Sequence, residues 1–227
     1  MAFVFDPIPT PSLPVVGTDK KFPVNRIFCV GRNYAEHARE MGHDPNKEPP
    51  FFFMKSADTL FHGHQLPYPD KTKDFHFEME LVVALKSGGV NIAPETALSH
   101  VFGYAVGLDM TRRDLQAEQK KLGRPWEVGK SFEKSAPCGP IHPVEKVGHV
   151  STGAIWLDVD GQRKQTADLK DMIWDIPNQI AFLSGLFELK PGDLIYSGTP
   201  AGVGAVQKGQ RMHGHVDGVG EIDITVV

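Results

Sequence analysis

Two glutamates in one apolar run have the spacing of a cation-binding pair. Glu78 and Glu80 lie two residues apart within residues 75–85, a run of mostly aromatic and aliphatic side chains with the length of a β-strand. Successive side chains of a strand point to opposite faces, so the two carboxylates share one face and the apolar residues between and beyond them share the other. A buried pair of like charges must share a proton or bind a cation.

A third carboxylate follows a second apolar run. Asp109 comes directly after residues 101–108, which are also predicted to form a strand. Three carboxylates that converge from two strands would form an all-oxygen site, the kind that Mg²⁺ or Mn²⁺ prefers. The alternative is that Glu78 and Glu80 belong to the solvent-exposed face of an edge strand, which is an ordinary environment for glutamate.

A histidine and a glutamate on a predicted helix have the spacing of a general base and its partner. Residues 34–41 are predicted to form this helix, which Asn33 caps and Gly42 ends. His37 and Glu40 are three residues apart and therefore share a face. A carboxylate beside an imidazole fixes its tautomer and raises its basicity, as a general base requires. The alternative is an ordinary surface ion pair on a short helix.

A second predicted helix, residues 112–122, starts close behind Asp109, with Thr111 as its cap. Arg113 and Gln116 share one face of it. The arginine could bind a carboxylate, and the glutamine could donate a hydrogen bond to a developing oxyanion. The alternative is an amphipathic surface helix with its polar residues in solvent.

Two lysines follow short predicted strands and could face an anionic ligand. Lys55 ends an aromatic strand, and Lys130 follows residues 126–128. A solvated strand end is the alternative for Lys55. Residues 129–131 imitate the end of a phosphate-binding loop, but Arg124 stands where that pattern needs a glycine, so we exclude a nucleotide site.

The second half of the chain reads as strands, turns and one helix. Asp160-Gly161 is a favoured two-residue turn and predicts a hairpin. Residues 176–186 are predicted to form an amphipathic helix. A strand at 193–197 leads into residues 198–204, where glycines would let the backbone approach a small ligand closely. The last predicted strand is 221–226.

Length and composition indicate one globular domain. The chain has 227 residues, of which 41% are hydrophobic and 23% charged, and its composition does not change abruptly along the sequence. Five prolines predict that residues 1–24 form an extended arm, followed by a single catalytic domain at 25–227. The net charge of −4 argues against a general nucleic-acid binder.

Membrane and secretory signals are not recognisable in the sequence. No apolar stretch approaches the roughly 20 residues of a membrane span. Residues 1–16 are apolar but carry Asp6 and four prolines, unlike the unbroken apolar core of a signal peptide. Cys29 and Cys138 have no metal-binding or redox spacing, which favours a reducing compartment. We therefore expect a cytoplasmic protein that binds neither membrane nor nucleic acid.

Five sequence blocks together resemble the fumarylacetoacetate hydrolase family in its small single-domain form. In chain order they are residues 30–37, 78–81, 107–116, 129–132 and 197–204, and they extend from about residue 25 to the end. One such block would be weak evidence, whereas five in the family's order are strong evidence. The resemblance implies an α+β fold, a mixed β-sandwich or β-roll with a few short helices. It also implies a homodimer.

The resemblance assigns roles to individual residues. Glu78, Glu80 and Asp109 are expected to bind one Mg²⁺ or Mn²⁺ ion per chain. His37 and Glu40 are expected to form a water-activating dyad on a short helix that folds over the site as a lid. Substrate contacts are implied for Arg113, Gln116, Lys130 and Thr199, of which Lys130 and Gln116 would stabilise an oxyanion.

The implied reaction is hydrolysis of a C–C bond in an acylpyruvate, a 2,4-diketo acid, with fumarylpyruvate as the expected substrate and fumarate and pyruvate as products. A carboxylate at the acyl end would need a cation, for which Arg32, Lys55 and Arg124 are unranked candidates. Ser56 follows Lys55 where many family members have proline. Oxaloacetate decarboxylation and isomerisation of hydroxymuconate-type acids use the same metal site and are the alternatives. A metal-binding protein without activity is a further alternative.

Overall fold

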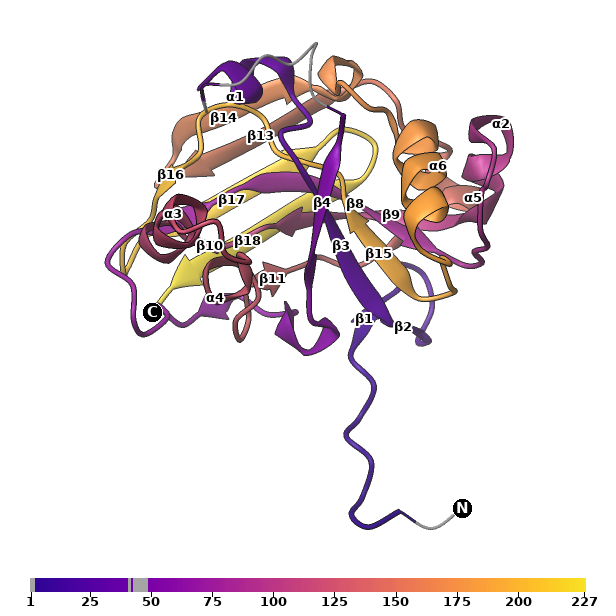
Figure 1. The fold of residues 1–227 in the computed structure, drawn as a ribbon, viewed down its shortest axis with the longest axis horizontal. Coiled ribbons are helices and arrows are strands. Elements are labelled where there is room, and N and C mark those ends of the chain that lie inside the picture. The colour runs from indigo at the N-terminus through magenta and orange to yellow at the C-terminus, as the bar shows by residue number, and fades with distance from the viewer. Residues whose placement is uncertain (1–2, 41, 43–48) are drawn as a thin grey trace.

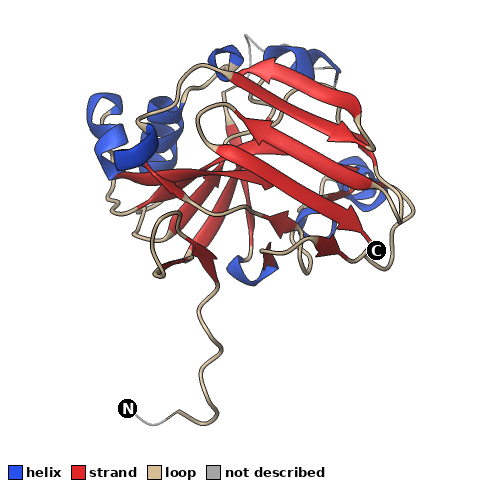
Figure 2. Cartoon of the chain, turned by 180° about the vertical axis from the view of Figure 1, so that it is seen from behind, coloured by secondary structure: helices blue, strands red, loops and turns tan. Residues whose placement is uncertain are grey.

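Two β-sheets form the body of the molecule and enclose its larger hydrophobic core (Figure 1, Figure 2). The computed structural model describes residues 3–40, 42 and 49–227. The six-stranded sheet has the order β12 (His142–Pro143), β9 (Val101–Leu108), β8 (Met79–Leu85), β15 (Asp193–Tyr196), β3 (Arg26–Gly31) and β4 (Phe51–Lys55). The five-stranded sheet has the order β14 (Gln162–Asp168), β13 (Ala154–Val159), β17 (Arg211–Val216), β18 (Gly220–Val226) and β6 (Gln65–Leu66).

Smaller elements surround the two sheets. A three-stranded sheet consists of β10 (Thr111–Arg112), β7 (Phe75–Phe77) and β16 (Gly204–Ala205), and β5 (Leu60–Phe61) pairs with β11 (Ala136–Pro137). The α-helices are α1 (Ala35–Glu40), α2 (Pro94–Ala97), α3 (Arg113–Lys121), α4 (Glu127–Lys130), α5 (Val144–Val147) and α6 (Ile176–Leu186). Single 3₁₀ turns occur at Ala57–Thr59, Leu98–His100 and Leu169–Asp171. This arrangement confirms the expected α+β fold of mixed sheets and short helices.

Strand β8 lies in the middle of the six-stranded sheet, and all seven of its residues are buried. Leu81 and Val83 face the larger core between the two sheets, whereas Val82 and Ala84 face a second core on the other side. The predicted alternation of faces is therefore correct. Because β8 is central rather than an edge strand, the alternative of a solvent-exposed pair of glutamates is wrong.

The N-terminal segment is less extended than its prolines predict. Strands β1 (Ser12–Pro14) and β2 (Lys21–Pro23) form an antiparallel hairpin, in which Leu13 lies opposite Phe22. Both side chains are buried in the second core, on the outer face of the six-stranded sheet. The description of residues 1–24 as an extended arm therefore holds only for residues 3–11, which run away from the body (Figure 1).

Three local predictions differ from the structure. The predicted strand 75–85 breaks at Glu78 into β7 and β8, which belong to different sheets. Residues 126–128, predicted as a strand, instead form the start of helix α4, and Trp126 at its N-terminus packs edge-on against Phe51. Thr111 does not cap α3, since it pairs with His76 as part of β10.

The predicted hairpin and the last helix are confirmed. β13 and β14 pair antiparallel across Asp160 and Gly161, whose φ angles of 49° and 76° are those that the tight turn requires. Helix α6 is capped by Asp175, whose side chain accepts a hydrogen bond from the backbone N–H of Asn178. None of the helices that the structure describes is long and apolar enough to cross a membrane.

Candidate active site

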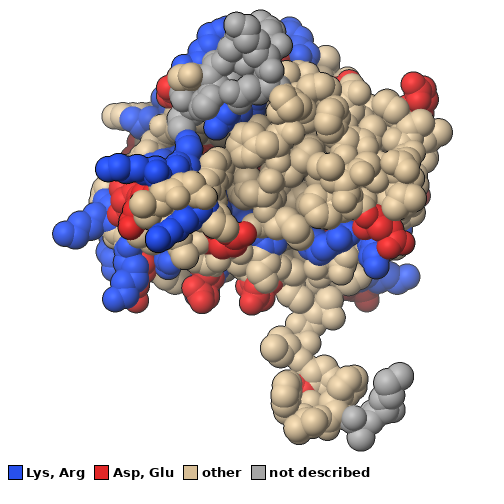
Figure 3. Space-filling view, viewed as in Figure 1, with Lys and Arg blue, Asp and Glu red and all other residues tan. Residues whose placement is uncertain are grey.

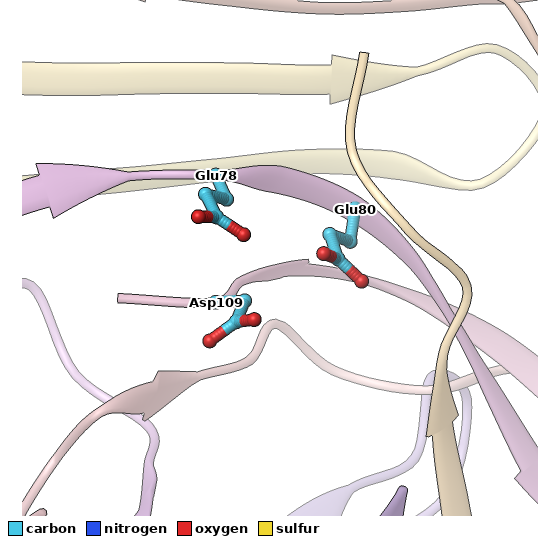
Figure 4. Close-up of side chains that lie close together, drawn as sticks. All are labelled: Glu78, Glu80 and Asp109. Atoms are coloured by element: carbon cyan, nitrogen blue, oxygen red, sulfur yellow. The ribbon is translucent and has the colours of Figure 1, made fainter. Parts of the chain in front are cut away.

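The three predicted carboxylates converge at one end of β8 and β9 (Figure 4). Glu80 lies opposite Gly107 in the β8–β9 ladder, and the N–H of Asp109 donates to the carbonyl of Glu78 over 2.8 Å. This pairing brings one oxygen of each carboxylate within 4.8 Å of the others. All three residues are buried: the solvent-exposed fraction is 6% for Glu78, 2% for Glu80 and 1% for Asp109.

The donor set fits a hard divalent cation. Oδ1 of Asp109 is buried and receives no well-directed hydrogen bond, although Lys55 Nζ lies 2.8 Å away. An orphaned carboxylate oxygen is costly in a buried position unless a cation binds it. Three buried carboxylates with no sulfur or imidazole among them are suited to Mg²⁺ or Mn²⁺.

Glu78 and Glu80 differ in protonation because their surroundings differ. Burial favours the neutral form of Glu78, but the charges of Lys130 and Arg113 outweigh it and lower the pKa of Glu78 below its ordinary value. Burial raises the pKa of Glu80 well above its ordinary value, and the charges of Asp109 and Glu78 raise it further. A hydrogen bond from the N–H of Gly198, at 2.8 Å, opposes this rise only in part. Without a cation, Glu80 therefore takes up a proton more readily than Glu78 does.

Lys130 bridges two of the carboxylates. Its Nζ lies 2.9 Å from Glu78 Oε2 and 2.7 Å from Asp109 Oδ2, and the residue is 2% exposed. Burial favours the neutral amine, but Asp109 and Glu78 outweigh it and raise the pKa of Lys130 above its ordinary value. Lys130 is therefore a charged ammonium whose third proton is not used by these two contacts.

Lys55 is buried in the interior of the protein and does not line the substrate pocket. It is 1% exposed, its Nζ donates to the carbonyls of Met110 and Lys130, and it pairs with Asp109. It is not among the residues that line the pocket in front of the carboxylates. The assignment of Lys55 as a substrate contact is therefore corrected: this lysine forms a buried ion pair with Asp109 and does not line the pocket.

Arg113 and Gln116, at the start of α3, face the pocket together. Arg113 donates to Glu78 Oε1 and, over 2.7 Å, to Gln116 Oε1. The oxygen of the Gln116 amide is thus occupied, and its N–H₂ group is the part that can donate to a ligand. Both residues lie on the predicted face of the helix, and the alternative of an exposed polar face is wrong for them.

His37 and Glu40 lie together on α1, at the edge of the pocket. His37 Nδ1 is 3.2 Å from Glu40 Oε2, which also accepts a hydrogen bond from the N–H of Gly202 at 3.3 Å. The Nδ1 proton therefore points to the carboxylate, and Nε2 is the basic nitrogen. The expected increase in basicity is outweighed, because burial lowers the pKa of His37 below 6.5 despite the opposing charges of Glu78 and Glu40.

The loop after β15 completes the pocket. Gly198 has a φ of 98°, and a Cβ there would lie 2.6 Å from the Cβ of Asn33, so glycine is required at this position. Thr199 lines the pocket and its hydroxyl accepts a hydrogen bond from Gln165 over 2.8 Å. Asn33 does not act as the helix cap that we expected, because its side chain binds the backbones of Trp174 and Ser197.

Several pocket residues were missed by the sequence analysis. Lys120 and Trp126 line the pocket with Phe51 and Phe53, and Gln165 supports it from β14. Lys120 had a detectable signal, since it lies seven residues after Arg113 and therefore on the same face of α3. Of the candidates for an acyl-end cation, Arg32 lines the pocket and Arg124 lines an adjoining cavity.

Comparisons with known proteins identify the family to which the chain is related. The family described as fumarylacetoacetate (FAA) hydrolase C-terminal matches residues 26–227. The chain is similar to a crystal structure of fumarylpyruvate hydrolase from Pseudomonas aeruginosa in complex with Mn²⁺ and pyruvate, with 52% identity, a TM-score of 0.98, and coverage of 100% of this chain and 99% of that one.

Two characterised relatives differ in their activities. The fumarylpyruvate hydrolase of a Ralstonia species is 46% identical over 81% of this chain and 95% of its own length. The mitochondrial oxaloacetate decarboxylase of Dictyostelium discoideum is 38% identical over 82% of this chain and 85% of its own length.

Proposed function

Since the chain belongs to the fumarylacetoacetate hydrolase family, we propose that it is a metal-dependent hydrolase of acylpyruvates, with fumarylpyruvate as substrate and fumarate and pyruvate as products. One observation carries this proposal: a pocket is lined on one side by the carboxylates Glu78 and Glu80 and on another by the base His37. A decarboxylase does not need an activated water, whereas a hydrolase does. The neutral, Glu40-oriented imidazole therefore favours hydrolysis.

Glu78, Glu80 and Asp109 would hold one Mg²⁺ or Mn²⁺ ion, which supplies Lewis-acid stabilisation of negative charge at the pyruvyl end of the substrate. Arg113 lines the same pocket and would orient the pyruvyl carboxylate. Because the same three ligands accept either ion, we leave the choice between Mg²⁺ and Mn²⁺ to metal analysis.

His37 Nε2 would take a proton from a water molecule, while Glu40 stabilises the resulting imidazolium through Nδ1. The water oxygen forms a bond to the acyl carbonyl carbon. Lys130 and Gln116 would donate hydrogen bonds to the oxyanion that develops there, each typically contributing roughly a hundred- to a thousand-fold in rate. The C–C bond then breaks, its electron pair passes into a pyruvate enolate, and the proton held by His37 returns to that carbon. The balance is one water consumed and one acid and one pyruvate released.

An absorbance assay of fumarylpyruvate tests this proposal. With chelator-treated protein we expect no loss of the enol absorbance, and with Mg²⁺ or Mn²⁺ added we expect loss of absorbance with fumarate and pyruvate as products. Pyruvate release from oxaloacetate without any hydrolysis of fumarylpyruvate would instead identify a decarboxylase. Inactivity toward every keto acid in the presence of metal would support a binding protein.

We also propose that the protein is a cytoplasmic homodimer. Both cysteines are buried and unpaired, as in a reducing compartment. A broad uncharged surface extends beside the charged part of the molecule (Figure 3), and the edge strand β4 and helix α6 expose Met54, Phe182 and Leu186. Such a surface is typical of an interface between subunits.

Light scattering after gel filtration should give a mass of twice the 25.0 kDa chain. Phe182→Asp should shift the protein toward the single-chain mass, because a charge would be buried in the interface. A single-chain mass for the unmodified protein at micromolar concentration would rule out this dimer.

A further inference from the structure

We propose that Lys120 binds the second carboxylate of the substrate, at the acyl end, and thereby selects acylpyruvates with a charged acyl end over those with a neutral one. This inference rests on the proposed function, because it concerns the same pocket. It names a specificity-determining residue that was not among the candidates from the sequence.

Lys120 is placed by helix α3 in the substrate pocket. It follows Arg113 by seven residues and Gln116 by four, so all three side chains share one face of the helix. The three residues line the same pocket as His37 and Glu80. Arg113 and Gln116 occupy the first turn, where Arg113 contacts Glu78, whereas Lys120 lies in the last turn, beside Trp126.

An aromatic wall holds the Lys120 ammonium at the pocket. Its Nζ lies 5.3 Å from the centre of the Trp126 ring, which in turn packs against Phe51 and Phe53. All of these rings line the pocket. An extended acyl chain would therefore contact flat apolar surfaces and meet a cation beside them.

The charge of Lys120 is not neutralised by the surrounding protein. Among the described residues it forms no ion pair with a carboxylate, in contrast to Lys130, which has two. Its pKa is lowered by partial burial and then by the positive charges of Arg32, Arg113 and Lys130, which the negative charge of Glu78 opposes only in part. An anion bound beside Lys120 would offset the repulsion between Lys120 and these three cations, and all four positive charges would attract the anion.

The charges of the metal-binding carboxylates, of the cations that contact them and of Lys120 agree with a substrate that carries two negative charges. The three carboxylates are matched by three cations, Lys55, Lys130 and Arg113. A divalent metal ion adds two positive charges, and Lys120 adds another. The pyruvyl carboxylate supplies only one negative charge, so a second carboxylate at the acyl end brings the pocket closer to neutrality.

The neighbouring lysine and arginine provide controls. Lys121 is the next residue of α3 and is exposed, and it is not a lining residue of the pocket. Arg124 is also exposed and lines the adjoining cavity instead. Lys and Arg side chains gather on the α3 side of the molecule (Figure 3), so loss of one positive charge there changes the long-range field similarly in each variant.

Calorimetry with two inert keto acids tests the inference without catalysis. The probes are 2-oxoheptanedioate and 2-oxoheptanoate, which differ only in the distal carboxylate and lack the 4-keto group that hydrolysis requires. For the Mn²⁺-loaded protein we expect the dianion to bind about 10–100-fold more tightly, the range typical of a charge-assisted hydrogen bond. Lys120→Met should remove this preference and leave the affinity for 2-oxoheptanoate within about two-fold. Lys121→Met should keep the preference, and Lys120→Arg should retain most of it.

Kinetics with fumarylpyruvate and acetylpyruvate provide the second readout. We expect Lys120→Met to raise KM for fumarylpyruvate about 10–100-fold and to change KM for acetylpyruvate far less, because only the former has an acyl-end carboxylate. An equal loss for both substrates, or equal binding of the two probes by the unmodified protein, would overturn the inference. Inactivity of the unmodified protein together with a Lys120-dependent preference for the dianion would instead refute the proposed hydrolysis and leave the carboxylate site standing.

Discussion

Replacing Glu80 with alanine is expected to abolish Mn²⁺ binding and to lower kcat/KM by at least about a thousand-fold, since Lewis-acid stabilisation contributes several kcal/mol. Glu80 is one of the three clustered, buried carboxylates and belongs to the central strand, so its replacement would remove one of the three proposed ligands from a rigid position. Titration calorimetry with Mn²⁺ and the fumarylpyruvate assay measure the two effects. Unchanged Mn²⁺ affinity in Glu80→Ala would refute the assignment of the metal ligands.

The protonation of Glu80 adds a sharper readout. Burial and the charges of Asp109 and Glu78 raise the pKa of Glu80, so we expect metal binding to release a proton from this carboxyl group. Calorimetry of the unmodified protein near neutral pH, in buffers with different ionisation enthalpies, should therefore detect proton release. Glu80→Gln should bind metal weakly and without that release. Asp158, an acid on β13 that lies outside the site, provides the control, because Asp158→Asn should change neither quantity.

Replacing His37 with alanine should lower kcat by roughly a hundred- to ten-thousand-fold while Mn²⁺ affinity stays the same. His37 lines the pocket and is not one of the metal-binding residues, so its loss removes the base and leaves the ligands in place. Steady-state kinetics and Mn²⁺ calorimetry on the same variant separate the two roles. Weaker Mn²⁺ binding in His37→Ala would show that this histidine supports the metal instead.

The pH dependence gives an independent test of the same residue. Only neutral His37 can accept a proton, so activity falls as the pH drops through its pKa. Because burial lowers that pKa below 6.5, activity should persist at pH 6.5 and decline only at lower pH. In His37→Ala the remaining rate should lack this decline. A half-maximal rate above pH 6.5 would contradict a buried, neutral imidazole.

Predictions from the sequence were correct where the position of a side chain depends only on the strand or helix that contains it. The predicted alternation of side chains along residues 78–84 was correct. Strand β8 packs against a hydrophobic core on each face, so alternate residues must point into opposite cores. His37 and Glu40 were paired correctly because helical spacing alone brings them together. The order of the five family blocks then predicted the α+β fold.

Errors arose where tertiary contacts override local signals. Thr111 has the features of a helix cap, yet it pairs with β7 and places its hydroxyl 3.3 Å from Glu78. Lys55 has the features of an exposed strand end, yet the strand delivers it into the interior behind Asp109. The local pattern of apolar and polar residues does not show how deeply a side chain is buried. It also does not show which sheet a short strand joins. Lys120 was overlooked for a different reason, because polar residues late in an amphipathic helix ordinarily face solvent.

The two ends of the substrate pocket are built from separate parts of the fold. The proposed metal ligands lie at the ends of β8 and β9, whereas the proposed acyl end is formed by side chains at α3, the start of α4 and the edge strand β4. Each of these elements also carries one cation that contacts a ligand, namely Arg113, Lys130 or Lys55. Substitutions that reshape the acyl end without disturbing a ligand are therefore expected at the rim positions Phe51, Lys120 and Trp126. Within this architecture we therefore expect a change of acyl group to be accommodated at these rim positions, with the three carboxylates and their cations retained.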